Sequence, residues 1–153
     1  MDYEQASAIN AAIRAIGMRH RALAGALLAP LGLHPGQEVL LLELDAKGPR
    51  TQGQLAVACG CEPPTITNSV RRLEAAGLVV RRPSPSDGRA TIVDLSEKGR
   101  TLMPKLRIAW LQLGEQTVAG VTTRALPELT GALQELAASL AAGDNPRLAV
   151  GSA

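Results

Sequence analysis

Apolar residues recur along the chain at steps of three and four, which predicts a mainly helical protein. The first such stretch carries Ile9, Ile13 and Ile16 on one side, as expected of an amphipathic helix. Six stretches show this pattern: 4–30, 33–48, 51–60, 62–76, 97–118 and 126–140. The pattern changes to β-rich runs only between the fourth and the fifth, so we expect one small β element in an otherwise helical chain.

Residues that start and stop helices separate these stretches. Pro30 is expected to end the first helix, Pro35 to occupy the first turn of the second, and Gly48 to end it. Thr51 and Gln54 have the spacing of a capping box at the start of the third. The second and third helices are therefore short, and they lead directly into the fourth.

The fourth stretch, "EPPTITNSVRRLEAA", has two distinct faces. At about 100° per residue, Ile66, Val70 and Leu73 form one narrow stripe for burial in a core. The remaining face carries small polar and basic side chains, which are Pro64, Thr65, Thr67, Asn68, Arg71 and Arg72. Such a face is either simply solvated or free to contact another molecule.

Two β-rich runs, "LVVRR" and "ATIVDL", follow this helix and flank "PSPSDG". The Asp-Gly pair is typical of a hairpin tip. A short helix, a turn, a polar helix and a basic hairpin together predict a winged helix-turn-helix. In that setting Arg71 and Asn68 are the candidates for reading bases, because Arg pairs with guanine and Asn with adenine in the major groove.

The other candidate DNA contacts surround these two residues. Thr65, Thr67 and Arg72 are better placed for phosphates and the groove edge, and Pro64 shares the outer face. Arg82 and Arg89 lie in the hairpin, and Arg89 is expected to reach a narrow minor groove from the tip. Asp87 is expected to stabilise that tip by accepting hydrogen bonds or pairing with an Arg.

The last two helical stretches and the first are the expected dimerisation layer. Ser96 can cap the fifth helix, which carries Leu106 and Trp110 on one side. The sixth has leucines in an alternating three-four pattern typical of a coiled-coil seam, which needs a partner either within the chain or from a second copy. The expected organisation is 1–32 for dimerisation, 33–100 for a winged helix-turn-helix lobe, 101–142 for dimerisation, and 143–153 as a flexible tail.

Composition and charge support this interpretation without deciding it. The net charge is only +2, but residues 71–107 hold nine basic and four acidic side chains, an excess of +5. This segment includes the end of the helix predicted at 62–76, which carries the base-reading candidates and is called the reading helix below. With one Trp, one Tyr and no Phe, the core is expected to be aliphatic. Two cysteines form no disulfide framework, and no stretch is long enough to span a membrane, so we expect a cytoplasmic protein without membrane association.

The segment "LAVACGCEPPTITNSVRRLEAAGLVVRRPSPSDGRATIVDLSEKG" resembles the DNA-binding lobe of the MarR family of bacterial transcription regulators. The shared features are the "RRLEAAGLV" run, an Asp87 two residues before Arg89, and "LSEKG" where relatives have a similar run. The resemblance is specific over residues 51–100, and elsewhere it lies in the order of the helices. One departure is Glu62, where relatives often have Ser or Asn to cap the reading helix.

The resemblance implies a homodimer that presents two reading helices and two wings to a pseudo-palindromic operator in duplex DNA. It further implies a repressor that releases DNA in response to a small-molecule effector or to stress. The alternative is a winged-helix module that binds proteins without sequence-specific DNA binding. These two functions differ in salt dependence, because phosphate contacts make DNA affinity fall steeply with salt.

Five residues of three kinds are candidates for sensing, each with a simpler structural alternative. Cys59 and Cys61 precede the reading helix and could react with oxidants or soft metal ions, or could pack as small apolar residues. His20, His34 and Trp110 could line an effector cleft, or could be packed or capping residues. No set of side chains suggests a catalytic centre, a metal site or a cofactor, so we expect no enzyme activity.

Overall fold

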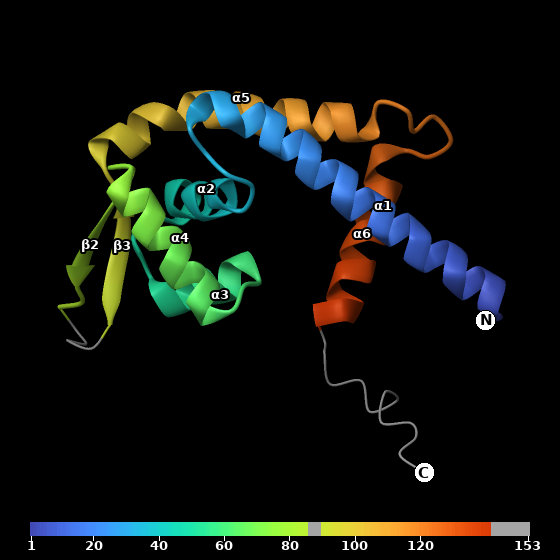
Figure 1. The fold of residues 1–153 in the computed structure, drawn as a ribbon, viewed down its shortest axis with the longest axis horizontal. Helices are drawn as coiled ribbons and strands as arrows, with labels where there is room; N and C mark the ends of the chain where they lie inside the picture. Colours follow the sequence, from blue (N-terminus) through green and yellow to red (C-terminus); the bar gives the residue numbers. More distant parts are fainter. Residues whose placement is uncertain (86–89, 142–153) are drawn as a thin grey trace, which may run out of the picture. The chain divides into compact units, whose positions relative to one another are not determined.

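The computed structural model describes residues 1–85 and 90–141, and its residues group into two compact units, Met1–Thr117 and Val118–Ala153 (Figure 1). The helices of the first unit are α1 (Tyr3–Leu28), the 3-10 turn η1 (Ala29–Leu31), α2 (Gln37–Lys47), α3 (Gln52–Cys59), α4 (Pro63–Ala75) and nearly all of α5 (Glu97–Val118). Its strands are β1 (Arg50–Thr51), β2 (Val79–Pro83) and β3 (Thr91–Leu95). The second unit contains α6 (Leu126–Ala141).

The helix boundaries follow the predicted signals, with one exception. Thr51 and Gln54 form the expected capping box at the start of α3, and Gly60 closes that helix in the left-handed conformation. Pro35, however, is not in the first turn of α2. The helix begins at Gln37, because Gly36 has φ 103° and serves as its N-cap.

The sheet has three antiparallel strands in the order β1-β3-β2, whereas the sequence predicted only the hairpin. Strands β2 and β3 pair from Val79 opposite Leu95 to Pro83 opposite Thr91. The N–H of Ser84 donates to the carbonyl of Ala90, so the pairing continues to the edge of the loop. We call this hairpin the wing; its tip at 86–89 lies outside the described residues.

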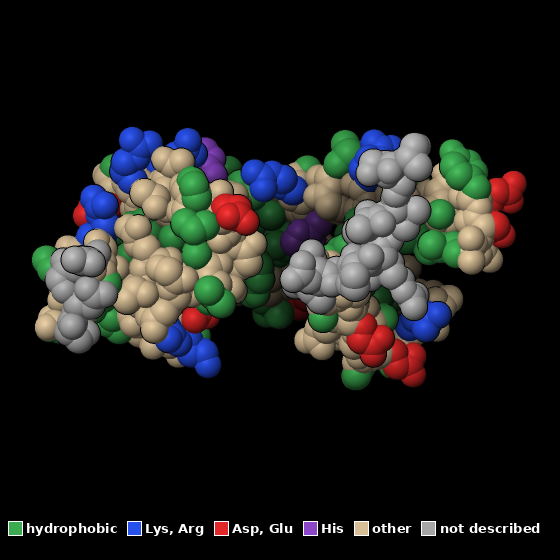
Figure 2. All heavy atoms as spheres, turned by 90° about the horizontal axis from the view of Figure 1, so that it is seen from below, with side chains coloured by type: hydrophobic (Ala, Val, Ile, Leu, Met, Phe, Trp, Pro, Cys, Tyr) green, Lys and Arg blue, Asp and Glu red, His purple; other side chains and the backbone are tan. Residues whose placement is uncertain are grey.

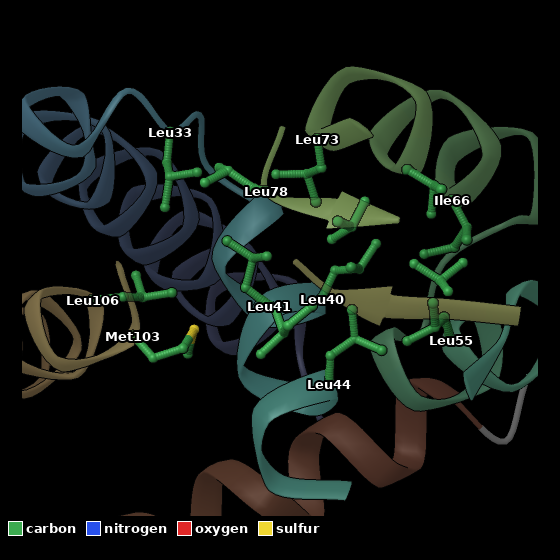
Figure 3. Packing of buried hydrophobic residues seen from close by; sticks show 14 of the residues in the cluster. Leu33, Leu40, Leu41, Leu44, Leu55, Ile66, Leu73, Leu78, Met103 and Leu106 are labelled. Carbon is green, nitrogen blue, oxygen red and sulfur yellow. The ribbon is translucent and has the colours of Figure 1, made fainter. Parts of the chain in front are cut away.

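The core is aliphatic, as the composition predicted, and it lies where α2, α3, α4 and the sheet meet (Figure 3). Leu40 and Leu41 of α2 share this cluster with Leu55 of α3 and Leu73 of α4. Met103 and Leu106 extend it onto α5. The buried stripe of α4 is thus held against a rigid layer, and its opposite face is left exposed.

Candidate nucleic-acid interface

The exposed face of α4 is built as the sequence predicted. Ile66, Val70 and Leu73 are at most 3% exposed, whereas every polar candidate on this helix is exposed. These exposed residues are Pro64, Thr65, Thr67, Asn68, Arg71 and Arg72. Because the apolar stripe is fully used in packing, the outer face is available for contact along the length of the helix.

Hydrogen bonds of Arg71 and Thr67 order the side chains on this face. The Arg71 guanidinium donates to the Asn68 Oδ1 atom at 3.3 Å, which places the two base-reading candidates side by side. The Thr67 hydroxyl lies 3.0 Å from the carbonyl of Pro63 and 3.4 Å from Gln52 Oε1 on α3. Thr67 therefore also links the two helices of the helix-turn-helix.

Glu62 precedes α4 as its N-cap, and its side chain makes no capping hydrogen bond. Pro63 occupies the first helical position, where a residue without an N–H is well tolerated. The start of the helix is therefore fixed by proline geometry and by Thr67, without the side-chain cap that Ser or Asn would provide.

The wing is attached to α4 by an ion pair. Arg81 Nε donates to Glu74 Oε2 at 2.8 Å, and the second contact of the pair is 2.5 Å. This hydrogen bond is the main reason why the pKa of Glu74 lies below its ordinary value. The neighbouring Arg82 has no ion-pair partner among the described residues, so its charge is free to meet an anion.

The basic side chains of residues 71–107, where an excess of positive charge was predicted, are of two kinds: some form ion pairs and others do not. Arg100 pairs with Asp94, and Arg107 pairs with Asp45. Within the described part of the chain, Arg71, Arg72 and Arg82 make no ion pair. Among the described residues of 71–107, the unpaired guanidinium groups thus lie on α4 and the wing, the two elements expected to contact DNA.

Two of the wing candidates cannot be placed. Asp87 and Arg89 lie outside the described residues, so the roles expected for them stay predictions.

Comparisons with known proteins agree with this geometry. Residues 31–90 match the profile of the MarR family. The HTH-type transcriptional regulator YwoH of Bacillus subtilis is 32% identical over 92 residues, which are 60% of this chain and 66% of that regulator.

Solved structures share the fold over most of their length. A probable transcriptional regulator from Pseudomonas aeruginosa is 32% identical, with a TM-score of 0.74 over 84% of this chain and 96% of that one. An Escherichia coli MarR mutant solved in complex with operator DNA has a TM-score of 0.79 and 20% identity, over 89% of this chain and 99% of that one. The chain belongs to the MarR family of DNA-binding transcriptional regulators. This family is not one of enzymes, in agreement with the sequence.

In this MarR-family chain, the end of α4 is fastened to the start of α5. Ser96 caps α5 as predicted, because its hydroxyl oxygen accepts from the N–H of Gly99 at 3.0 Å. The same hydroxyl donates to the carbonyl of Gly77 at 2.6 Å, and Lys98 Nζ donates to the carbonyl of Ala76 at 2.7 Å. We call these contacts the α4–α5 junction; the sequence pattern showed the cap but not the link to α4.

Gly99 is required at this junction for a steric reason. A Cβ atom at this position would lie 2.1 Å from the carbonyl oxygen of Leu78, far inside van der Waals contact. Only glycine lets α5 pass so close to the chain leaving α4. The position of the reading helix is therefore set by backbone contacts, and α5 connects it to the rest of the unit.

Cys61 lies in the turn before α4, as predicted, whereas Cys59 is the last residue of α3; both are half-buried. Cys61 Sγ donates to the carbonyl of Cys59 at 3.3 Å. The pKa of Cys59 lies above its ordinary value, mainly because burial disfavours the thiolate, with further contributions from Cys61, Glu43 and Glu38. Because oxidants attack the thiolate, this environment favours the packing role over sensing.

The remaining effector candidates are His20, His34 and Trp110. His20 lines a hollow between α1 and the end of α5, together with Arg19. His34 lines a different hollow beside α4. Trp110 is 41% exposed and lines neither of these two hollows. Their grouping in one effector cleft, and the packed or capping roles that were its alternative, stay predictions.

Within residues 1–85 and 90–141, no three His, Cys, Asp or Glu side chains are arranged to hold a metal ion. Among the helices of those residues, none has both the length and the apolar character needed to cross a membrane.

Proposed function

We propose that this regulator binds a pseudo-palindromic operator in duplex DNA as a homodimer, with α4 of each copy in the major groove. The observation that carries the proposal is the exposed face of α4, where free Arg side chains and small polar groups stand opposite a fully buried stripe. An α-helix fits the major groove, where each base pair presents a distinct pattern of donors and acceptors. A face of this composition suits both the bases and the phosphates.

Arg71 and Asn68 are the proposed base-reading residues. Arg donates two hydrogen bonds to guanine, and Asn pairs with adenine. Their mutual hydrogen bond holds both side chains in place before DNA arrives, which reduces the conformational entropy lost on binding. Thr65, Thr67 and Arg72 are proposed to contact phosphates and the groove edge. From the wing, Arg82 is proposed to contact DNA, and Arg89 to reach a narrow minor groove.

The proposed dimer is formed by residues 1–32 and 101–142. Its support is the exposed apolar stripe on α1, with Ile9, Ile13 and Ile16, and the exposed leucines of α6. A two-fold dimer presents two reading helices to half-sites about 10–10.5 base pairs apart, centre to centre.

We further propose that the protein is a repressor whose DNA affinity is lowered by a small effector. A structurally similar protein, BpsR of Bordetella bronchiseptica, was solved in a study of the regulation of its DNA binding by 6-hydroxynicotinic acid; it has a TM-score of 0.77 and 22% identity over 84% of this chain and 98% of that one. In this chain, the hollow lined by Arg19, His20 and Leu23 combines a positive charge with apolar surface, which suits an anionic molecule.

The proposal is tested by titrating the protein against the duplex upstream of its own coding region, at several salt concentrations, with a scrambled duplex as control. Tight binding to the upstream duplex alone, falling steeply with salt, is the expected result. Affinity for a protein partner, together with salt-insensitive or absent DNA binding, would instead indicate the protein-interaction module.

Single substitutions separate the two kinds of contact. Arg71→Ala should cost about 1 to 3 kcal/mol of binding free energy and relax the preference at one base pair. Arg89→Ala should weaken binding to all sequences with little change in major-groove preference. Unchanged affinity in both variants, measured by fluorescence anisotropy on the upstream duplex, would contradict these assignments.

A further inference from the structure

A polar hollow borders α4 on the side away from the wing. It is lined by Arg21 near the end of α1, by His34 in the turn before α2, and by one flank of α4. That flank consists of Thr65, Asn68, Ser69 and Arg72. We call the whole hollow the α1–α4 hollow. Arg21 did not stand out in the sequence, because only the tertiary fold brings α1 to α4.

The two flanks of α4 have different neighbours. At about 100° per residue, Thr65, Ser69 and Arg72 lie on one side of the outer face. Glu74 lies on the other side, where it binds Arg81 of the wing. The outer face of α4 thus runs between the wing and the α1–α4 hollow.

The charge of the hollow is strongly one-sided. Arg21 and Arg72 bring two guanidinium groups from separate elements, and no carboxylate side chain lines the hollow. Within the described residues neither Arg has an ion pair, in contrast to Arg81, Arg100 and Arg107. Figure 2 shows basic side chains gathered along the upper left edge. Two unpaired guanidinium groups beside hydroxyl groups favour an anion.

The backbone at this point is already occupied, so side chains must supply the contacts. The N–H of His34 donates to Gln37 Oε1 at 2.9 Å, and the N–H of Gly36 donates to Glu38 Oε2 at 2.6 Å. The N–H groups of His34 and Gly36 are therefore already used within the chain. The groups left to bind an anion are the Arg21 and Arg72 guanidiniums, the His34 ring and the α4 hydroxyls.

We infer that the α1–α4 hollow binds a backbone phosphate of the same duplex that α4 reads, with Arg21 and Arg72 as its two charged ligands. The major groove is about 12 Å wide, and a helix with its side chains is about 10–12 Å across. The flanks of an inserted helix therefore face the phosphates along both walls of the groove. The wing contacts the phosphates along one wall of the groove, and the hollow contacts a phosphate along the other.

This inference rests on the proposed function and adds Arg21, a residue of the first helix, to the DNA contacts. Phosphate contacts fix the register of a protein on DNA but do not read sequence. Arg21 and Arg72 should therefore contribute affinity and salt dependence, and leave the choice of bases to Asn68 and Arg71.

The test is Arg21→Gln, with Arg14→Gln as the matched control on the same helix, two turns earlier. Both residues are exposed, so both variants should fold, which circular dichroism verifies. Binding to the upstream duplex is measured against salt concentration. For Arg21→Gln the slope of log K against log salt should fall by about 0.9, the value for one phosphate contact, while the preference over scrambled DNA persists. Arg14→Gln should keep the wild-type slope.

A second arm locates the phosphate. Methylphosphonate substitution neutralises one phosphate of the duplex at a time. At one position per half-site, methylphosphonate and Arg21→Gln should each reduce the binding free energy, and the two reductions should not add, because both changes remove the same contact. Additive losses at every position would overturn the inference.

Three results distinguish its failure from failure of the proposed function. A steep wild-type slope that Arg21→Gln leaves unchanged overturns the inference alone. A wild-type protein without salt-dependent DNA binding overturns both. Saturable binding of inorganic phosphate to the free protein at constant ionic strength, lost in Arg21→Gln without any change in DNA slope, would assign the hollow to a free anion and overturn the inference.

Discussion

The winged-helix lobe and the terminal helices are built from the same aliphatic residues at the same helical spacing, yet they bury them to very different extents. Leu40, Leu55 and Val70 of the lobe are 0% exposed. Ile13 of α1 is 37% exposed, and Leu133 of α6 is 47% exposed. The lobe completes its core within one chain, whereas the apolar faces of α1 and α6 remain open within one chain.

Hydrophobic periodicity therefore predicts that a face will be covered but not what covers it. In α4 the covering layer comes from α2, α3 and the sheet of the same lobe. For the stripes of α1 and α6 we propose a second copy. Substitutions in the two regions should consequently differ in kind, with loss of folding in one and loss of association in the other.

The largest expected effect is on the core of the lobe. Leu40→Ala should lower the free energy of unfolding by about 2 to 5 kcal/mol, because it removes buried methyl groups and leaves a cavity. Urea denaturation at two protein concentrations measures this cost. Leu140→Ala on α6 is the matched comparison, since Leu140 is 68% exposed. This substitution should change only how much the free energy of unfolding depends on protein concentration, because it affects association and not the core. An equal loss of unfolding free energy in the two variants would contradict the proposed difference between the lobe and the terminal helices.

The α4–α5 junction should respond almost as strongly. Gly99→Ala is expected to cost about 3 kcal/mol, the upper end of ordinary overpacking, because the new methyl group meets the Leu78 carbonyl. Gly114→Ala, in the same helix with nothing within 4 Å of the new methyl group, should leave thermal stability unchanged or raise it. A Gly99→Ala protein as stable as wild type would show that the reading helix is not fixed by this backbone contact.

A smaller effect is expected on the seam of α6. Leu133→Gln should raise the dissociation constant of the dimer at least about tenfold, because the substitution occurs twice in a symmetric interface. Sedimentation velocity over a dilution series measures the shift. Gln134→Ala, one residue along on the side away from the leucines, is the control. If Leu133→Gln leaves association unchanged, the seam is covered by something other than a second copy.

The smallest effect concerns the ion pair between α4 and the wing. The pKa of Glu74 is lowered by Arg81, so the stability that this pair contributes is present above the ordinary glutamate pKa of 4.5 and is lost as the pH falls through the lowered value. Arg81→Gln should therefore reduce the melting temperature slightly at pH 7, with the difference from wild type shrinking below pH 4.5. Arg82→Gln, which breaks no ion pair among residues 1–85 and 90–141, should show no such pH dependence.

Most of the lobe could be predicted because its signals are local. The faces of α4 follow from residue spacing alone, and the caps at Thr51 and Ser96 from short motifs. Strand β1 could not be found, since Arg50 and Thr51 are strand only through their pairing with Val93 and Ile92. The α1–α4 hollow was missed for the same reason, because it joins residues from separate elements.

The central claim is that two copies of this chain together bind one operator. Sedimentation equilibrium of the protein with the upstream duplex tests it most directly. We expect a complex containing one duplex and two chains of 15.9 kDa each, with free protein at twice the chain mass. A complex with a single chain, or free protein at 15.9 kDa throughout the concentration range, would contradict it.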